Sequence, residues 1–265
     1  MTNPEFTVQL SRESGRAAFG TDAVGYHNAR SGYPAALYDR LFNNVPPQAR
    51  VMEIGAGTGL VTEELVSRNI RTLTVVEPDP ALVRFMESRL VDPRLAFVTA
   101  AFPDAAIDGP FDLIACAAAF HWMEPVAALA RVRQLLAPGG TWAMWWNSYR
   151  NAGKGDALSD AVTPLLAGVI LPPSDSLDGH YSLDEALHRR TLADAGFGTV
   201  DYILYRTERE LSTSQVIALY QSYSYIRLLE EDRRARFLDG LADIVETRFG
   251  GLAPNLILTP FYLAR

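Results

Sequence analysis

Residues 51–59 read Val-Met-Glu-Ile-Gly-Ala-Gly-Thr-Gly, an apolar run that ends in alternating glycines. Gly55, Gly57 and Gly59 fall between a predicted strand (50–54) and a predicted helix (62–68). At such a junction the chain turns tightly, and a ligand can approach the backbone because glycine has no side chain. The stretch therefore predicts a ligand site at the carboxyl end of the first strand of an α/β sheet.

Two acidic residues narrow the class of ligand. Glu53 precedes the first glycine, where a carboxylate would repel a pyrophosphate but attract the cationic amino end of an amino acid. Leu60 stands where a dinucleotide-binding fingerprint needs its third glycine, so a nicotinamide-dependent oxidoreductase is disfavoured. Glu77 ends the second predicted strand, where an acid can accept hydrogen bonds from both ribose hydroxyls of a nucleoside.

Short β-branched runs alternate with helical segments on both sides of this loop. Predicted strands cover 50–54, 72–77, 95–99, 111–117, 141–146, 199–207 and 256–263, and predicted helices cover 62–68, 80–90, 124–136, 156–167, 214–223 and 230–249. This order predicts an α/β, Rossmann-like, doubly wound sheet of seven mostly parallel strands with an α-helical lid over its carboxyl edge. We expect one domain over 1–265, divided into an N-terminal helical cap (1–45), a cofactor-binding core (46–147) and lid insertions with closing strands (148–265).

Composition limits the partners. The 265 residues carry a formal net charge of −7 and no basic run, so nucleic acid and anionic membranes are disfavoured and a small-molecule substrate is favoured. The N-terminus shows no signal peptide, and the single cysteine, Cys116, allows neither an intrachain disulfide nor a Cys-x-x-Cys site. We expect a cytoplasmic protein without a metal centre; the oligomeric state stays open.

The ordered motifs resemble the class I S-adenosylmethionine-dependent methyltransferases, in particular the small-molecule branch related to trans-aconitate methyltransferase. Besides the two acids and the glycine loop, the likeness includes Tyr26-x-x-x-Arg30, Phe111-Asp112-Leu-Ile, Phe120-His121-Trp122, Leu136-x-Pro-Gly-Gly and Tyr220-x-x-Tyr-Ser-Tyr225. It implies S-adenosylmethionine as cofactor and methyl transfer as the reaction. A binding or cyclase-type protein that keeps this fold and the cofactor without transferring a methyl group is the alternative.

The resemblance also implies roles for individual residues. Glu53 would hold the amino group of the cofactor and Glu77 its ribose, while Tyr26 and Arg30 would close over the methionine carboxylate. The implied cofactor-binding residues are Tyr26, Arg30, Glu53, Gly55, Ala56, Gly57, Thr58, Gly59, Glu77, Pro78, Leu82, Ala101, Phe102 and Ala117.

The acceptor side is less defined. The segment after the fourth strand lacks the Asn/Asp-Pro-Pro-aromatic motif of nucleobase amino methyltransferases, and Cys116 lies inside the strand, away from the place of a cytosine C5 nucleophile. We expect an oxygen acceptor, carboxylate or hydroxyl, in a largely apolar pocket. A hydroxyl needs a base and a carboxylate does not, so His121 is the candidate catalytic base or, alternatively, a packing residue. The predicted substrate-binding residues are His121, Trp122, Trp146, Tyr220, Tyr223 and Tyr225.

Overall fold

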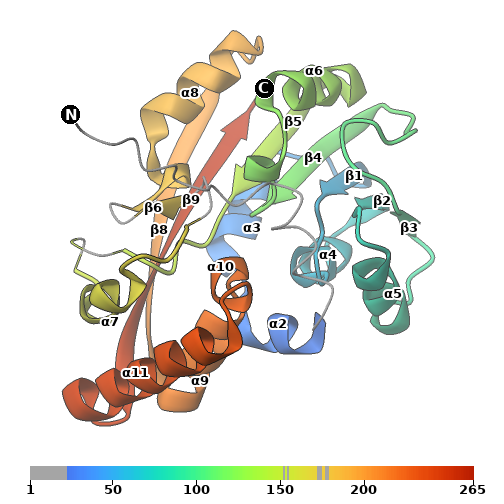
Figure 1. The fold of residues 1–265 in the computed structure, drawn as a ribbon. Coiled ribbons are helices and arrows are strands. Elements are labelled where there is room, and N and C mark those ends of the chain that lie inside the picture. The colour runs from blue at the N-terminus through green and yellow to red at the C-terminus, as the bar shows by residue number, and fades with distance from the viewer. Residues whose placement is uncertain (1–22, 152, 154, 172–174, 177–178) are drawn as a thin grey trace, which may run out of the picture.

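The computed structural model describes residues 23–151, 153, 155–171, 175–176 and 179–265 (Figure 1). Residues 1–22 of the expected N-terminal cap lie outside the described residues. The strands are β1 (Ala49–Ile54), β2 (Ile70–Val76), β3 (Leu95–Val98), β4 (Phe111–Ala117), β5 (Leu136–Trp145), β6 (Asp175–Ser176), β7 (Gly179–His180), β8 (Val200–Ser212) and β9 (Leu252–Ala264). The helices are α2 (Ala23–Ala29), α3 (Ala35–Phe42), α4 (Leu60–Val66), α5 (Pro80–Arg89), α6 (Pro125–Leu135), α7 (Ala157–Val162), α8 (Glu185–Asp194), α9 (Thr213–Gln221), α10 (Ser224–Arg227) and α11 (Glu231–Phe249).

Within the described residues, seven strands form one sheet in the order β3-β2-β1-β4-β5-β9-β8. The first five strands of this order pair in parallel, whereas β9 runs antiparallel to both β5 and β8. The predicted Rossmann-like sheet of seven mostly parallel strands is confirmed. The remaining pair, β6 and β7, makes a separate two-stranded sheet.

Strand β4 shows why the centre of the sheet is buried on both faces. Leu113 and Ala115 pack into the apolar cluster that includes α3 and α4, while Ile114 and Cys116 point to the opposite cluster with α6. Successive side chains alternate between the two faces of a strand, so a strand covered on both faces must be continuously apolar. Two acids stand out at the carboxyl edge of this apolar sheet: Glu53 near the end of β1 and Glu77 directly after β2.

Three boundaries differ from the sequence prediction. Strand β5 begins at Leu136 rather than at 141, because the expected Pro138-Gly139-Gly140 breaker lies inside the strand as an irregularity, with Gly139 at φ +75° and a shift in register against β4. Strands β8 and β9 each run for 13 residues. The extra length of β8 was hidden by its charged residues, which alternate outward along an exposed edge strand. Helix α8 was not predicted; Asp184 caps it by accepting a hydrogen bond from the Leu187 amide.

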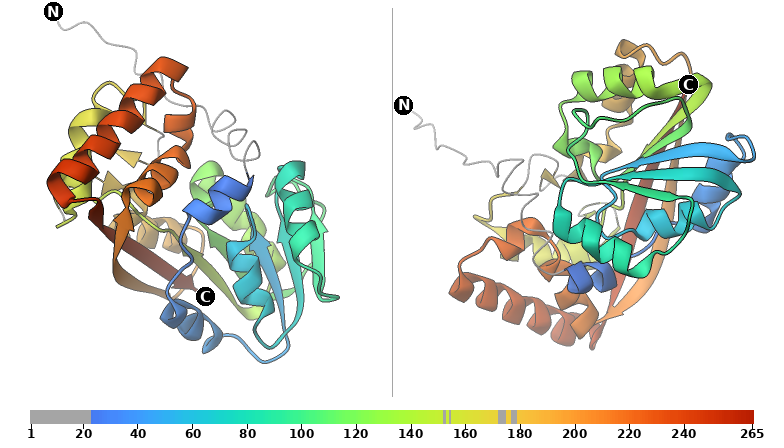
Figure 2. Two further views of the ribbon diagram at one scale, coloured as in Figure 1. Left: turned by 90° about the horizontal axis from the view of Figure 1, so that it is seen from below. Right: turned by 90° about the vertical axis from the view of Figure 1, so that its right-hand side faces the viewer.

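The lid gathers beyond the carboxyl ends of β1, β4 and β5. Helices α9 and α11 pack together against the extended far ends of β8 and β9, and α2 lies against α9 (Figure 1). Seen from below, α2 lies between the lid helices and α4 with α5 (Figure 2). The chain therefore brings its N-terminal helix and its C-terminal third to the same edge of the sheet.

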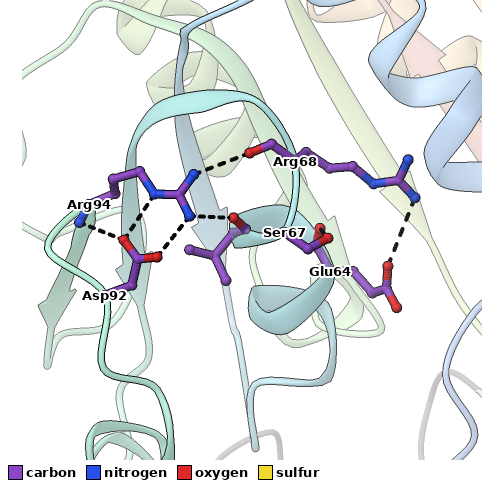
Figure 3. A network of polar contacts seen from close by, with 6 residues as sticks. Glu64, Ser67, Arg68, Asp92 and Arg94 are labelled. Carbon is purple, nitrogen blue, oxygen red and sulfur yellow. Dashed lines mark hydrogen bonds and ion pairs between the residues drawn. The ribbon is translucent and has the colours of Figure 1, made fainter.

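Helix α4, which carries the glycine loop at its start, is held at its other end by Arg94. The Arg94 guanidinium donates to the carbonyls of Val66 (2.7 Å) and Arg68 (3.2 Å) and to Asp92 (Figure 3). Hydrogen bonds from Arg94 lower the pKa of Asp92 to about 2. The arginine satisfies carbonyls that a helix end leaves without partners, so the carboxyl end of α4 is fixed.

Candidate functional site

A cavity of about 380 Å³ opens at the carboxyl ends of β1, β2 and β4. Most of the predicted cofactor-binding residues line it: Tyr26, Glu53, Gly55, Ala56, Gly57, Thr58, Glu77, Pro78, Leu82, Ala101, Phe102 and Ala117. Gly59 and Arg30 do not line it. Tyr33 and Asp79 do, although they were not predicted. The sequence did carry a signal for Asp79, because it precedes Pro80 at a helix start directly after Glu77.

The glycine loop makes a tight turn at the edge of the cavity. Gly55 has φ +70°, and a Cβ there would come within 2.4 Å of the Ala119 Cβ. Gly57 has φ +60°, yet a Cβ at this position would meet no protein atom within 4 Å. Gly55 is therefore needed for packing inside the protein, whereas Gly57 presents bare backbone to the cavity.

Glu77 is held in place by the backbone around it. One carboxylate oxygen accepts the Gly57 amide hydrogen bond (2.9 Å) and the other accepts that of Asp79 (3.0 Å). The side chain is 6% exposed and lines the cavity. Each carboxylate oxygen has a second lone pair, so the group keeps acceptor capacity toward the cavity.

Glu53 is the more buried of the two acids, at 1% exposure. It accepts a hydrogen bond from the Thr62 hydroxyl at 2.7 Å. Burial raises the pKa of Glu53 to about 8; the Thr62 hydrogen bond opposes this shift and the nearby Glu77 adds to it. A cationic group in the cavity would reverse the penalty, because an opposite charge favours the ionised form.

His121 lies in a short 3-10 turn, Phe120–Trp122, directly after β4. Its neighbour Trp122 lines the cavity, with the two ring centres 4.7 Å apart. The Trp146 indole N–H donates to Nδ1 of His121 at 3.2 Å. Trp146 is 1% exposed and stacks on His188 with ring centres 5.5 Å apart. It is a core residue that supports His121 and does not line the cavity.

The three predicted lid tyrosines do not line the cavity either. Tyr220 is 2% exposed and packs on Tyr223 and Phe237 in the lid core. Tyr223 and Tyr225 stack on each other with ring centres 5.2 Å apart. The Arg30 guanidinium lies over Tyr223 at 4.7 Å and over Tyr26, which lines the cavity, at 5.1 Å.

Comparison with known proteins identifies the chain. Residues 51–140 match the model of a methyltransferase domain family. An uncharacterized methyltransferase of Mycobacterium tuberculosis, Rv3342, is 31% identical over 169 residues, which cover 59% of this chain and 68% of the relative. The chain belongs to the methyltransferase family.

Two further relatives extend over more of the methyltransferase chain. The Schizosaccharomyces pombe protein C25B8.10, an uncharacterized methyltransferase-like protein, is 24% identical over 238 residues and covers 86% of each chain. A solved structure from Anabaena variabilis, assigned as a methyltransferase of an antibiotic biosynthesis pathway, superposes with a TM-score of 0.62 at 18% identity. It covers 87% of this chain and 96% of its own, which supports the fold.

S-adenosylmethionine is the cofactor of this methyltransferase, and the cavity fits it. Gly57 leaves room over the backbone, Glu77 offers oxygens for a ribose, and Glu53 offers a buried carboxylate for an ammonium group. Ala101 and Phe102 line the cavity next to Pro78 and Leu82, where an adenine would find apolar surface. The assignment of each residue to a part of the cofactor stays a prediction.

The hydrogen bond from Trp146 defines what His121 can do. An indole only donates, so Nδ1 of His121 is an acceptor and the proton of the neutral ring is on Nε2. In this tautomer Nε2–H is a donor, and Nδ1 is already used. Catalysis by His121 stays a prediction, but the geometry favours a hydrogen-bond donor over a base.

Other chemistries find less support in the described part of the chain. Burial raises the pKa of the Cys116 thiol well above its usual range, so this cysteine is a core residue and not a nucleophile. Among the described residues, no group of three or more histidine, cysteine, aspartate or glutamate side chains gathers as metal ligands would. In the same residues, no helix combines the length and apolar character needed to cross a bilayer.

Proposed function

We propose that this methyltransferase transfers the methyl group of S-adenosylmethionine to an oxygen of a small molecule, and that this oxygen belongs to a carboxylate. The observation that carries the proposal is the Trp146–His121 hydrogen bond. A hydroxyl acceptor must lose its proton during transfer, whereas a carboxylate is already ionised above about pH 5. A histidine that presents Nε2–H suits the second acceptor, because it can donate to a carboxylate oxygen and orient it.

The reaction asks little of the protein beyond alignment. When bound, S-adenosylmethionine supplies an electrophilic methyl group on a positively charged sulfur that leaves as a neutral thioether. Glu53 would hold the amino group of the cofactor and Glu77 its ribose. Trp122 would close the cavity on the acceptor side. Orientation of two reactants in this way replaces much of the entropic cost of their encounter.

The alternative is a cyclase-type or binding protein that keeps the cofactor cavity without methyl transfer. The acids and glycines of the cavity are compatible with both functions, since their expected role is to bind the cofactor. What favours methyl transfer to oxygen is the donor at the end of β4, His121, next to a cavity-lining aromatic residue, Trp122. The proposal also keeps the remaining expectations from the sequence: a cytoplasmic enzyme without nucleic-acid or membrane partners, related to trans-aconitate methyltransferase.

The test is product formation from S-adenosylmethionine labelled in the methyl group. The enzyme is incubated with a panel of carboxylic acids and with the alcohols and amines of the same carbon skeleton. We expect label in base-labile methyl esters of one or more acids. Transfer only to the alcohols or amines would contradict the carboxylate, and binding of S-adenosylhomocysteine without transfer to any compound would favour the alternative.

A further inference from the structure

The guanidinium of Arg30 is enclosed by aromatic rings on the lid side of the cavity. It lies over Tyr26 (5.1 Å), Tyr149 (5.2 Å) and Tyr223 (4.7 Å), measured to the ring centres. One terminal nitrogen donates weakly to the Ser222 carbonyl at 3.4 Å. The Nε atom is buried and has no hydrogen-bond partner among the described residues. Within the same residues, no carboxylate forms an ion pair with this cation.

A second arginine, Arg150, faces the same pair of rings and is buried. Arg150 is 8% exposed, its guanidinium lies 5.8 Å from the Tyr225 ring centre, and it donates to the Tyr225 hydroxyl at 3.4 Å. Because Tyr225 stacks on Tyr223, the two arginines are associated with one aromatic pair. We call Tyr26, Arg30, Tyr149, Arg150, Tyr223 and Tyr225 the lid chamber.

The surroundings of the lid chamber add buried hydrogen-bond donors and a histidine that is held neutral. The hydroxyls of Ser31 and Tyr223 are buried without hydrogen-bond partners among the described residues. Burial, together with the charges of His188, Arg150 and Arg30, lowers the pKa of His180 to about 3. Buried donors that lack partners among the described residues, such as the Arg30 Nε and these hydroxyls, are costly, so the group calls for a ligand that accepts hydrogen bonds and carries negative charge.

The lid chamber adjoins the cofactor cavity. Tyr26 belongs to both, because it lines the cavity and lies under Arg30. On the other side His121 contacts Trp122 of the cavity and lies 6.0 Å from His180 between ring centres. A molecule held in the chamber would therefore lie next to the cofactor cavity.

We propose that the lid chamber binds a carboxylate of the methyl acceptor, with Arg30 as its main ligand and Arg150 adding positive charge. The inference rests on the proposed function, since it names the group by which the acceptor is recognised. It replaces the expectation that Arg30 holds the methionine carboxylate. A guanidinium matches a carboxylate with two parallel hydrogen bonds, which makes arginine the suitable residue for this recognition.

Calorimetry tests the proposal on the protein loaded with S-adenosylhomocysteine. The probes are hexanoate, decanoate and phenylacetate, each compared with the alcohol of the same skeleton. We expect at least one carboxylate to bind more tightly than its alcohol. Arg30→Gln should lower the affinity for that carboxylate about 10- to 100-fold, which is the loss expected for hydrogen bonds between charged groups. Arg30→Lys should retain part of the affinity, and Arg150→Gln should weaken binding less.

The matched control is Arg236→Gln, an exposed arginine on the lid helix α11, which should change nothing. The affinity for S-adenosylhomocysteine in Arg30→Gln should stay within about twofold of the wild type. A loss of S-adenosylhomocysteine affinity that spares 5′-methylthioadenosine, which lacks the amino-acid part, would assign Arg30 to the cofactor carboxylate and overturn the proposal. Failure of every carboxylate to bind better than its alcohol would overturn it as well.

The outcomes separate this inference from the proposed function. Carboxylates that bind through Arg30 but yield no methyl ester would support the role of the lid chamber and contradict the proposed reaction. Methyl esters formed equally well by the wild type and Arg30→Gln would support the reaction and overturn the role of the chamber.

Discussion

The cofactor cavity and the lid chamber meet at Tyr26 but are built from opposite chemistry. The cavity offers bare glycine backbone and two buried acids, Glu53 and Glu77, and suits a ligand with an ammonium group and hydroxyls. The chamber offers Arg30, whose Nε is buried, and the buried Arg150 among tyrosine rings, and it suits an anion. The contrast indicates how two adjoining regions can hold two small molecules in order, since each region repels the charge that the other attracts.

Gly57→Val should produce the largest effect, because it fills the cavity and leaves the chamber alone. The new side chain meets open space in the free protein, so the stability cost is that of the left-handed backbone, about 1–2 kcal/mol. Binding of S-adenosylhomocysteine, measured by calorimetry, should be lost. Gly196→Val is the control: it has φ +86° and open space too, but lies outside the cavity. Normal binding by the Gly57 variant would mean that this loop is not the cofactor site.

Glu77→Ala should weaken the binding of S-adenosylhomocysteine by about 2–4 kcal/mol, since hydrogen bonds to a charged acceptor are lost. The same change frees the Gly57 amide that the carboxylate holds. Glu77→Gln keeps the volume of the side chain and should lose less of the binding free energy. Titration calorimetry of both variants is compared with Glu87→Gln, an exposed position on α5. Unchanged affinity in a folded Glu77→Ala protein would remove Glu77 from ribose binding.

The pH dependence of the cavity follows from the raised pKa of Glu53, about 8. The folded state binds this proton more tightly than the unfolded state, so the free protein should lose stability as pH rises from about 4.5 to 8, by at most about 1.4 kcal/mol per pH unit. S-adenosylhomocysteine affinity should rise over pH 6–8, by up to about tenfold per unit, because its ammonium group pairs with the ionised form. Thermal unfolding and calorimetry across pH measure both slopes. If Glu53→Gln keeps the slopes of the wild type, another group is responsible.

His121→Ala separates the two acceptor mechanisms. With a carboxylate acceptor we expect KM to rise about tenfold, from the loss of one charge-assisted hydrogen bond, while kcat changes little and stays flat above pH 5. Steady-state kinetics from pH 5 to 9 measure both parameters. A fall in kcat of about 10²–10⁴-fold, with a wild-type titration near pH 6–7, would instead establish His121 as a base.

Trp146→Phe should have the smallest effect. It removes the donor that places the proton of His121 on Nε2 while keeping an aromatic ring against His188. With both tautomers accessible we expect KM for the acceptor to rise about two- to fivefold, a loss of less than 1 kcal/mol. Nitrogen NMR of His121 reports the tautomer directly. A wild-type His121 protonated on Nδ1 would contradict the role given to Trp146.

The cavity could be predicted from the sequence because its signals are local. Gly55, Gly57 and Glu53 lie within five positions on one strand–loop junction, and Glu77 ends the neighbouring strand, so chain order nearly equals spatial order. The sheet followed from the alternation of apolar strands and helices for the same reason. Charged residues hid the length of β8, whose edge position is a property of the assembled sheet.

The lid chamber could not be predicted in the same way. Its residues come from α2 with the residue after it, from the segment after β5 and from α10 with the residue before it, and only tertiary packing brings them together. Tyr223 and Tyr225 were predicted as substrate-binding residues, but Tyr149 and Arg150 were not. The partner of His121, Trp146, is 25 positions away and pairs with it only because β4 and β5 are neighbours.

A crystal structure with S-adenosylhomocysteine tests the division between the two regions most directly. The account predicts the ribose on the Glu77 carboxylate, the amino-acid end over Gly57 with its ammonium group toward Glu53, and the Arg30 guanidinium still enclosed by Tyr149 and Tyr223. A ligand whose carboxylate is bound by Arg30, or one that lies outside the glycine-lined cavity, would contradict it.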